Sequence, residues 1–209
     1  MTITLYAAPM SSAIPVVHAI EELEVPHHLV RLDLQAGDQH QAAFLALNPH
    51  GKVPTLVVEG TPMFEALAII QWLGDRYGVE RGLWPAADAS ERLEALSWST
   101  WMYVSFGAAF KRWILARSTS DRVDGSPHPE GPAELAISEL RGMVAIVDAR
   151  LASRDHLVGD RFTLVDLIVA NGMAYAAVAG VSTNGYDHVD RWLDSVRQRP
   201  AWKKAWTME

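Results

Sequence analysis

Two adjacent serines, Ser11 and Ser12, lie between a segment with strand character, residues 3–7, and one with helix character, residues 13–23. A hydroxyl that donates to a charged acceptor contributes about 1.5–3 kcal/mol, and a helix N-terminus stabilises an anion by up to about 2 kcal/mol. Together these effects are large enough to hold an alkyl thiol, which ordinarily titrates near ~8.5, as a thiolate at neutral pH. Serine also caps helices well, so the pair has a purely structural interpretation too.

The chain contains no cysteine, and this limits where a thiol can come from. Cysteine nucleophiles, disulfides and thiolate metal ligands are excluded, so any thiol chemistry uses a sulfur that arrives with a ligand. The eight histidines are scattered and form no HxxxH or HExxH pair. The sequence therefore predicts no metal site.

Composition and charge exclude other classes of protein. Apolar residues make up 49% and charged residues 21%, which is typical of a folded globular chain. The net charge is −7 with no basic run, so we expect no nucleic-acid binding. The longest apolar stretch, 164–181, is interrupted by Asp166 and Asn171, which indicates a buried helix and no membrane span. Residues 1–6 lack the features of a signal peptide, so we expect a cytoplasmic protein.

The elements that would position the serines form a small α/β arrangement. Strand-like segments are expected at 3–7, 28–32, 55–58 and 62–64, with helices at 13–23 and 65–77. This order predicts a domain with a mixed sheet over residues 1–78.

The sequence after residue 78 has a different character. Gly82 and Pro85 indicate a linker over residues 79–88, and an all-helical domain is expected over 89–209. Its helices are expected at 89–116, 133–151, 163–179 and 188–198, with a loop at 118–132; Arg199-Pro200 is interpreted as the stop of the last helix.

The start of one of these helices carries a capping box. Thr163 is expected to cap the helix while Asp166 reaches back to the cap, with Phe162 and Leu167 as the flanking apolar pair. The cap alone stabilises the helix by roughly 1 kcal/mol, and such a box by itself indicates folding chemistry only.

Four stretches give the chain a resemblance to bacterial cytosolic glutathione S-transferases of the serine type (theta/delta/beta-like). Residues 5–12 resemble the first strand and catalytic loop, and residues 44–56 are similar to the family's NP-x-G-x-VP-x-L segment. Residues 64–70 resemble the motif that opens the third helix, and residues 159–166 match the family's capping box. The resemblance covers about residues 2–206 and implies a fold of α/β plus all-α class: a thioredoxin-like domain with a four-stranded mixed sheet, then a helical domain.

The resemblance also implies a ligand site. Pro54 is expected to be cis, so that the N–H and C=O of Val53 pair with the cysteinyl backbone of glutathione as an added strand does; the alternative is a trans Pro54 that only ends a loop. Glu65 is expected to hold the γ-glutamyl amino group, or else merely to favour the helix start. Lys52, with Gln39 and His40, is expected to hold the glycyl carboxylate, or to be ordinary surface.

Ala66 departs from the family pattern, which has Ser or Thr at this position. Alanine offers an anion only its backbone N–H, so one hydrogen bond of roughly 0.5–1.5 kcal/mol is lost and binding is expected to be weak. The family branches disagree on the thiol donor: serine-type branches match Ser11, which we favour, and the cysteine-type bacterial branch matches Ser12. Tyr6 belongs within the first strand and is not expected to be the donor.

The second substrate is expected against the helical domain. Met102, Tyr103, Phe106 and Phe110 follow one another at helical spacing and would line an apolar pocket, although such a stripe also suits a core. Trp98, Trp101 and Trp113 on the same helix suit either a bulky pocket or a dimer surface.

The resemblance predicts a detoxifying homodimeric transferase that conjugates glutathione, as co-substrate, to apolar electrophiles without a metal. Two alternatives remain open: a glutathione-dependent isomerase, peroxidase or ether-cleaving enzyme, or a non-catalytic protein that binds ligands. Ala66 and the two candidate serines favour the last of these.

Overall fold

The computed structural model describes residues 1–117 and 130–208. By contacts between residues, these fall into two compact units, one formed by residues 1–92 with the segment from 197 onward, and one by residues 93–196. Each unit is described by itself.

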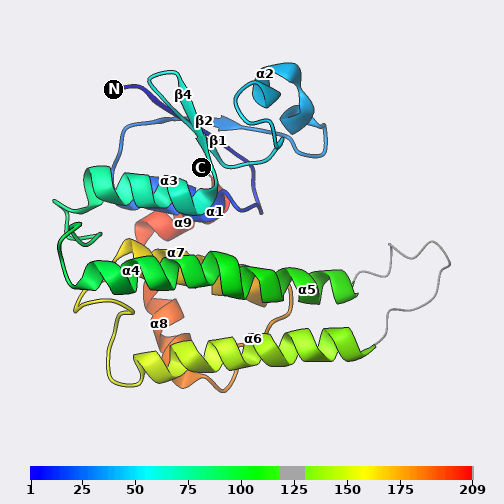
Figure 1. Cartoon of the computed structure of the whole chain (residues 1–209), viewed down its shortest axis with the longest axis vertical. Coiled ribbons are helices and arrows are strands. Elements are labelled where there is room, and N and C mark those ends of the chain that lie inside the picture. The colour runs from blue at the N-terminus through cyan, green and yellow to red at the C-terminus, as the bar shows by residue number, and fades with distance from the viewer. Residues whose placement is uncertain (118–129, 209) are drawn as a thin grey trace. The chain divides into compact units, whose positions relative to one another are not determined.

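The first unit is built on a four-stranded mixed sheet (Figure 1). Its strands are β1 (Ile3–Ala7), β2 (His28–Arg31), β3 (Thr55–Val58) and β4 (Thr61–Phe64), in the order β2-β1-β3-β4. β1 pairs parallel with β2 and antiparallel with β3, and β3 pairs antiparallel with β4. This confirms the predicted mixed sheet of the thioredoxin-like domain.

Helices α1 (Ile14–Glu22) and α3 (Ala66–Leu73) lie on one face of this sheet and contact each other (Figure 1). Alternate residues of β1 are buried, and so is a continuous face of each helix, as the apolar periodicity requires. Pro15 is tolerated in α1 because it falls in the first turn, where no hydrogen bond is lost.

α3 is shorter than the expected helix 65–77, since its last turns widen into a π-helical segment, Gly74–Gly78. A Cβ on Gly74 would lie 2.7 Å from the Trp84 ring, so glycine leaves the room that this indole fills. Trp84 Nε1 donates to Asp75 Oδ1 at 2.9 Å, and Arg92 pairs with Asp75 while lying over the indole. The expected linker 79–88 is thereby fastened to the first unit.

Three short helical elements of the first unit were not predicted: η1 (Asp38–His40), α2 (Ala42–Leu45) and α9 (Pro200–Thr207). The interpretation of Pro200 as a stop was incomplete, because this proline also begins α9 at its first position. α9 packs on α1, and Arg199 donates to both carboxylate oxygens of Glu22 at 2.6 and 2.7 Å.

Among the residues that the structure describes, the second unit consists of helices and the turns that connect them, with no strand. The expected helix 89–116 is α4 (Glu91–Trp101) and α5 (Gly107–Arg117), joined by a π-helical segment, Met102–Phe106. Of the expected loop 118–132, residues 118–129 lie outside the described residues and 130–132 belong to α6.

The remaining helices of this unit are α6 (Glu130–Leu151), α7 (Leu164–Val178) and α8 (Asp187–Arg197). The capping box of α7 is confirmed: Val165 N donates to Thr163 Oγ1 at 3.2 Å, and Thr163 N donates to Asp166 Oδ2 at 2.9 Å. Asp166 also accepts from Leu157 N and from Trp192 Nε1. Its burial raises the pKa of the carboxyl, against the effect of these donors. No helix among the described residues is both long and apolar enough to cross a bilayer.

Candidate functional site

The candidate site lies in the first unit, at the end of the sheet where β1 ends, β3 begins and β4 ends. Tyr6 pairs with Thr55 across β1 and β3, and Thr55 pairs with Phe64 across β3 and β4. Three segments therefore meet at the same end of the strands: the one after Ala7, the one before Thr55 and the one after Phe64. These segments carry most of the residues predicted to bind a ligand.

Ser11 lies in the turn from β1 to α1, which Met10 enters with a positive φ of 49°. The Ser11 hydroxyl donates to Ala8 O at 2.6 Å and accepts from Ala13 N at 3.2 Å. The serine therefore satisfies the backbone N–H of Ala13, but the residue at the cap position of α1 is Ala13 itself, and among the described residues no side chain makes a capping bond at this position. Its hydroxyl proton is held by a carbonyl of its own turn.

Ser12, the next residue, makes a long-range contact. Its hydroxyl donates to Val53 O at 2.9 Å, a bond between positions 41 residues apart. The Val53-Pro54 peptide bond is cis, as predicted. The Val53 side chain is buried, and within the described part of the chain no acceptor is found for its amide N–H.

Asn48, which the prediction of site residues missed, braces the loop that leads to Pro54. Its buried amide donates to Lys52 O at 2.7 Å and to Thr55 Oγ1 at 3.1 Å, while its carbonyl oxygen accepts from His50 N at 3.1 Å. The side chain therefore ties both ends of the loop together before any ligand binds. Its place directly before Pro49 in the turn was the available signal.

Glu65 precedes α3 with φ 72° and ψ 112°, a backbone conformation that side chains other than glycine rarely adopt. The Glu65 side chain is exposed and does not cap the helix, so the first N–H groups of α3, beginning at Ala66, have no side-chain acceptor from this residue. A carboxylate and the first N–H groups of α3 therefore lie side by side, which suits a group that carries both an amine and a carboxylate.

Gly51 lies directly before Lys52, where the segment of Gln39 and His40 packs against it. Gln39, His40 and Lys52 are the residues predicted for the glycyl carboxylate. A Cβ at this position would lie 3.1 Å from Gln39 O and 3.2 Å from His40 Nδ1, so the segment 39–40 packs closely on the residue before Lys52. Lys52 and His40 are exposed, and Gln39 donates from Nε2 to Leu34 O at 3.2 Å. The two segments that carry the residues predicted for the glycyl carboxylate are thus neighbours.

The four residues predicted for the second substrate lie in the second unit. Met102 and Phe106 are buried, and the Met102 side chain fills the space that Gly172 leaves on α7. Tyr103 and Phe110 are partly exposed, and the Phe110 ring lies 6.0 Å from that of Tyr175. Two of the four side chains are therefore held in the core of the unit, and two have exposed surface.

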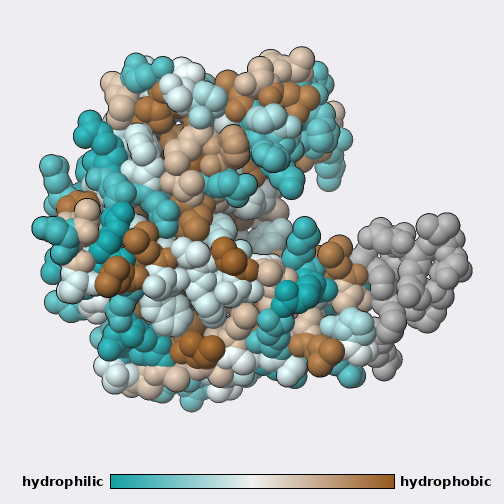
Figure 2. Space-filling view, in the orientation of Figure 1, coloured by the Kyte–Doolittle hydropathy of each residue, from teal (hydrophilic) through white to brown (hydrophobic). Residues whose placement is uncertain are grey.

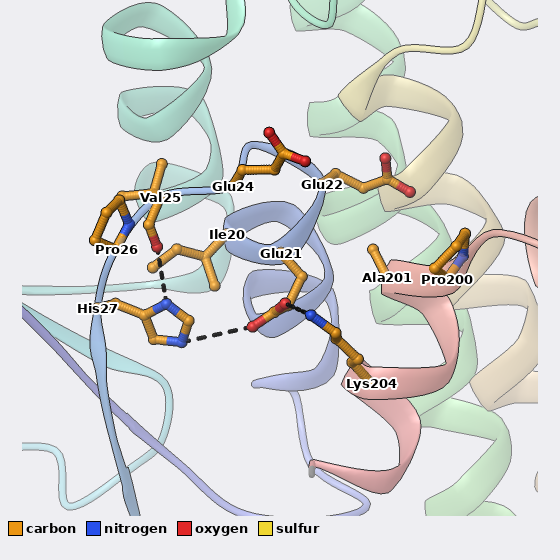
Figure 3. Close-up of a pocket in the computed structure, with 10 residues that line it drawn as sticks. All are labelled: Ile20, Glu21, Glu22, Glu24, Val25, Pro26, His27, Pro200, Ala201 and Lys204. Atoms are coloured by element: carbon orange, nitrogen blue, oxygen red, sulfur yellow. Dashed lines mark hydrogen bonds and ion pairs between the residues drawn. The ribbon is translucent and has the colours of Figure 1, made fainter.

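A different pocket, of about 620 Å³, lies at the opposite end of α1 from the serines, against α9 (Figure 3). Glu21 in its wall pairs with Lys204 at 2.8 Å and lies 3.9 Å from His27 Nε2, which faces it from the chain leading to β2. The ion pair of Glu21 with Lys204 joins α1 to α9, so we assign the pocket to the packing of α9. Among the residues that the structure describes, no cluster of three or more potential metal ligands occurs.

Two family models match the chain. "Glutathione S-transferase, N-terminal domain" matches residues 1–75, and "Glutathione S-transferase, C-terminal domain" matches residues 125–200. "Glutathione S-transferase hmp2" of Hypomyces subiculosus is 30% identical over 98% of both chains. "Glutathione S-transferase GstB" of Escherichia coli (strain K12) is 28% identical over 97% of this chain and 96% of its own.

Solved structures resemble the chain over its whole length. The structure of a sphingomonad glutathione S-transferase complexed with glutathione has a TM-score of 0.82 and 25% identity and covers 98% of each chain.

Proposed function

The chain belongs to the glutathione S-transferase family, and we propose that it binds glutathione as a co-substrate and transfers its thiolate to an apolar electrophile. The observation that carries this proposal is the cis Val53-Pro54 turn beside the two serines. There the Val53 N–H, for which the described residues provide no acceptor, and the adjacent Val53 carbonyl offer two backbone groups that an extended peptide can pair with.

The remaining groups at this end of the sheet fit the two ends of glutathione. The γ-glutamyl end carries an amine and a carboxylate, for which Glu65 and the N–H groups at the start of α3 provide a partner each. The glycyl end carries a carboxylate, which we assign to Lys52 with Gln39 and His40. The neighbour solved with glutathione supports this assignment of the ligand.

Ser11 is the proposed donor to the sulfur. When the ligand thiol loses its proton to solvent, the Ser11 hydroxyl exchanges a neutral carbonyl acceptor for a charged one, and charge-assisted hydrogen bonds are about twice as strong as neutral ones. The N-terminus of α1 adds its positive end. The thiolate then attacks the electrophilic carbon, and the leaving group departs with the electron pair of its bond.

The electrophile is proposed to be apolar because the second unit offers Tyr103 and Phe110, with Met102 and Phe106 packed in the same stretch of helix. Ala66 supports a second candidate, a glutathione-transferase-like protein that binds its ligand without turnover, since a ligand held by fewer hydrogen bonds is less firmly oriented.

A homodimer in the cytoplasm with a detoxifying role is the assembly and setting we propose. Exposed apolar side chains on the face shown in Figure 2 form small groups among polar ones. One shallow groove on the second unit, about 470 Å³ in volume, is lined by Leu96, Trp101 and Val104 among others. Leu93 on α4 and Val104 in the π-helical segment Met102–Phe106 are 75% and 61% exposed, and we assign this face of the second unit to a second copy.

The test is the ultraviolet absorbance of the thiolate of bound glutathione, followed as the pH is varied. We expect an absorbance at neutral pH that free glutathione lacks and that S-methylglutathione, which has no ionisable thiol, does not produce. Conjugation of an aryl halide should then exceed reduction and isomerisation of standard substrates. A protein that binds glutathione without any thiolate at neutral pH would contradict the transferase and leave the binding protein.

A further inference from the structure

We propose that Ser12 is a positioning residue, which holds the Val53 carbonyl in place for the peptide backbone of glutathione and does not donate to the sulfur. The inference deepens the proposed function and rests on it. It separates the roles of two neighbouring serines that the sequence treats alike.

The argument begins with the proton of the Ser12 hydroxyl. A hydroxyl has one proton to donate, and that of Ser12 goes to Val53 O at 2.9 Å. To donate to a thiolate, Ser12 would have to release the carbonyl of the very residue that pairs with the ligand. A carbonyl oxygen has two lone pairs, so Val53 O can accept from Ser12 and from the cysteinyl N–H of the ligand together.

Ser11 is under no such constraint. Its proton goes to Ala8 O, three residues back in the same turn, and its oxygen accepts from Ala13 N. Neither partner belongs to the loop that carries Pro54. Ser11 can therefore turn its proton to a sulfur without disturbing the segment that holds the peptide.

Hydrogen bonds from side chains brace both of the peptide planes that flank Val53. Asn48 Nδ2 donates to Lys52 O at 2.7 Å, and Thr55 Oγ1 donates to the same oxygen at 3.3 Å. These bonds fix the plane that contains the Val53 N–H. Ser12 donates to Val53 O, which fixes the plane that contains the carbonyl. The buried Val53 side chain anchors the residue between them, so N–H and C=O are both oriented before the ligand arrives.

The experiment compares wild type with Ser12→Ala, Ser12→Thr and Ser11→Ala, using glutathione and S-methylglutathione as the two ligands. Calorimetry gives each dissociation constant, and ultraviolet titration gives the pKa of the bound thiol. For Ser12→Ala we expect both ligands to bind about 3- to 10-fold more weakly, because one hydrogen bond that orients the carbonyl is lost, with the thiol pKa unchanged. Ser12→Thr keeps the hydroxyl and should restore binding. Ser11→Ala should raise the thiol pKa and leave S-methylglutathione binding unchanged.

Several outcomes would overturn the inference. If Ser12→Ala abolished the thiolate while S-methylglutathione bound normally, Ser12 would be the donor. If Ser12→Ala changed neither the dissociation constants nor the pKa of the bound thiol, the hydrogen bond from Ser12 to Val53 would have no role in ligand binding. A wild-type protein that binds neither ligand would instead refute the proposed function, and this result is distinct because it appears before any substitution is made. Thermal unfolding of each variant identifies a loss of binding that comes from misfolding.

Discussion

At the residue scale, Ala66 offers a ligand only its backbone N–H at the start of α3. Ala66→Ser adds a hydroxyl beside the proposed γ-glutamyl carboxylate, and we expect glutathione to bind up to about 10-fold more tightly in calorimetry. Ala68→Ser is the matched control, because two residues further along the helix a side chain points about 200° away. Equal affinities of the two variants would mean that the γ-glutamyl group lies elsewhere.

Glu65 combines an unfavourable backbone conformation with the proposed ammonium partner. Glu65→Gly should raise the free energy of unfolding by about 1 kcal/mol, since glycine adopts the positive φ of 72° without strain, and should weaken glutathione binding 10-fold or more. Glu24→Gly, at φ 49°, is the control that should gain some stability without losing binding. Denaturant titration and calorimetry measure the two effects. Unchanged binding in Glu65→Gly would remove this carboxylate from the site.

Among individual site residues, the ones within a local motif were predictable and the ones that depend on folding were not. The cis Pro54 followed from its resemblance to a known segment. The Ser12 bond to Val53 joins positions 41 residues apart, and no spacing in the sequence indicates it. The burial of Met102 depends on Gly172, a residue of another helix, so helical periodicity alone did not separate core from pocket.

At the scale of elements, the contact of α1 with α9 contains a buried titratable cluster. His18 is fully buried, contacts Glu22 at 3.4 Å on its own helix, and meets the Trp202 ring of α9 edge-on; Arg199, just before α9, faces the same carboxylate. Burial by itself would raise the pKa of Glu22, but hydrogen bonds from Arg199 and His18 outweigh it and lower the pKa to about 2. Burial lowers the pKa of His18 despite Glu22.

Both shifts make the protein less stable in acid. A group with a depressed pKa contributes stability above its unfolded value, and this contribution is lost as the pH falls toward the folded value. We therefore expect the free energy of unfolding to decrease below pH 6.5 through His18, and again between pH 4.5 and about 2 through Glu22. Glu22→Gln should remove about 1–2 kcal/mol of the second decrease, after allowance for solvent screening.

Denaturant unfolding at a series of pH values measures these slopes. Arg199→Lys serves as the comparison, because lysine keeps the charge but loses the two-pronged contact with Glu22. In this variant the free energy of unfolding should still decrease between pH 4.5 and about 2, by less than in the wild type but by more than in Glu22→Gln. An unaltered slope below pH 4.5 in Glu22→Gln would show that this carboxylate does not stabilise the docking of α9.

The elements themselves were predictable where alternation or periodicity was strong. The strands of the sheet and the capped helix α7 lie close to their expected positions. α2 and α9 were not predicted because each is short. For α9 there was a second reason, since Pro200 was interpreted only as the stop of the preceding helix. The π-helical segment Met102–Phe106 was not predicted, because one wider turn leaves the apolar residues close to the spacing expected for an α-helix.

At the scale of the whole molecule, we expect a dimer of about twice 23.1 kDa in light scattering after size exclusion. Val104→Glu places a charge on the exposed face of the second unit assigned to a second copy, and should shift the mass toward that of one chain. Leu135→Glu, at a side chain that is 74% exposed on α6, is the matched control and should leave the dimer intact. A dimer that survives Val104→Glu would place the interface elsewhere.

The return of α9 to α1 makes the first unit discontinuous along the chain, and this has a consequence for synthesis on the ribosome. Residues 93–196 form a continuous unit and are complete before the segment from 197 onward has been translated. During synthesis the surface of α1 that binds α9 therefore stays uncovered until the more than one hundred residues of the second unit have been translated. A nascent chain stalled before residue 197 would therefore contain every residue of the proposed glutathione site and still lack the helix that closes its unit.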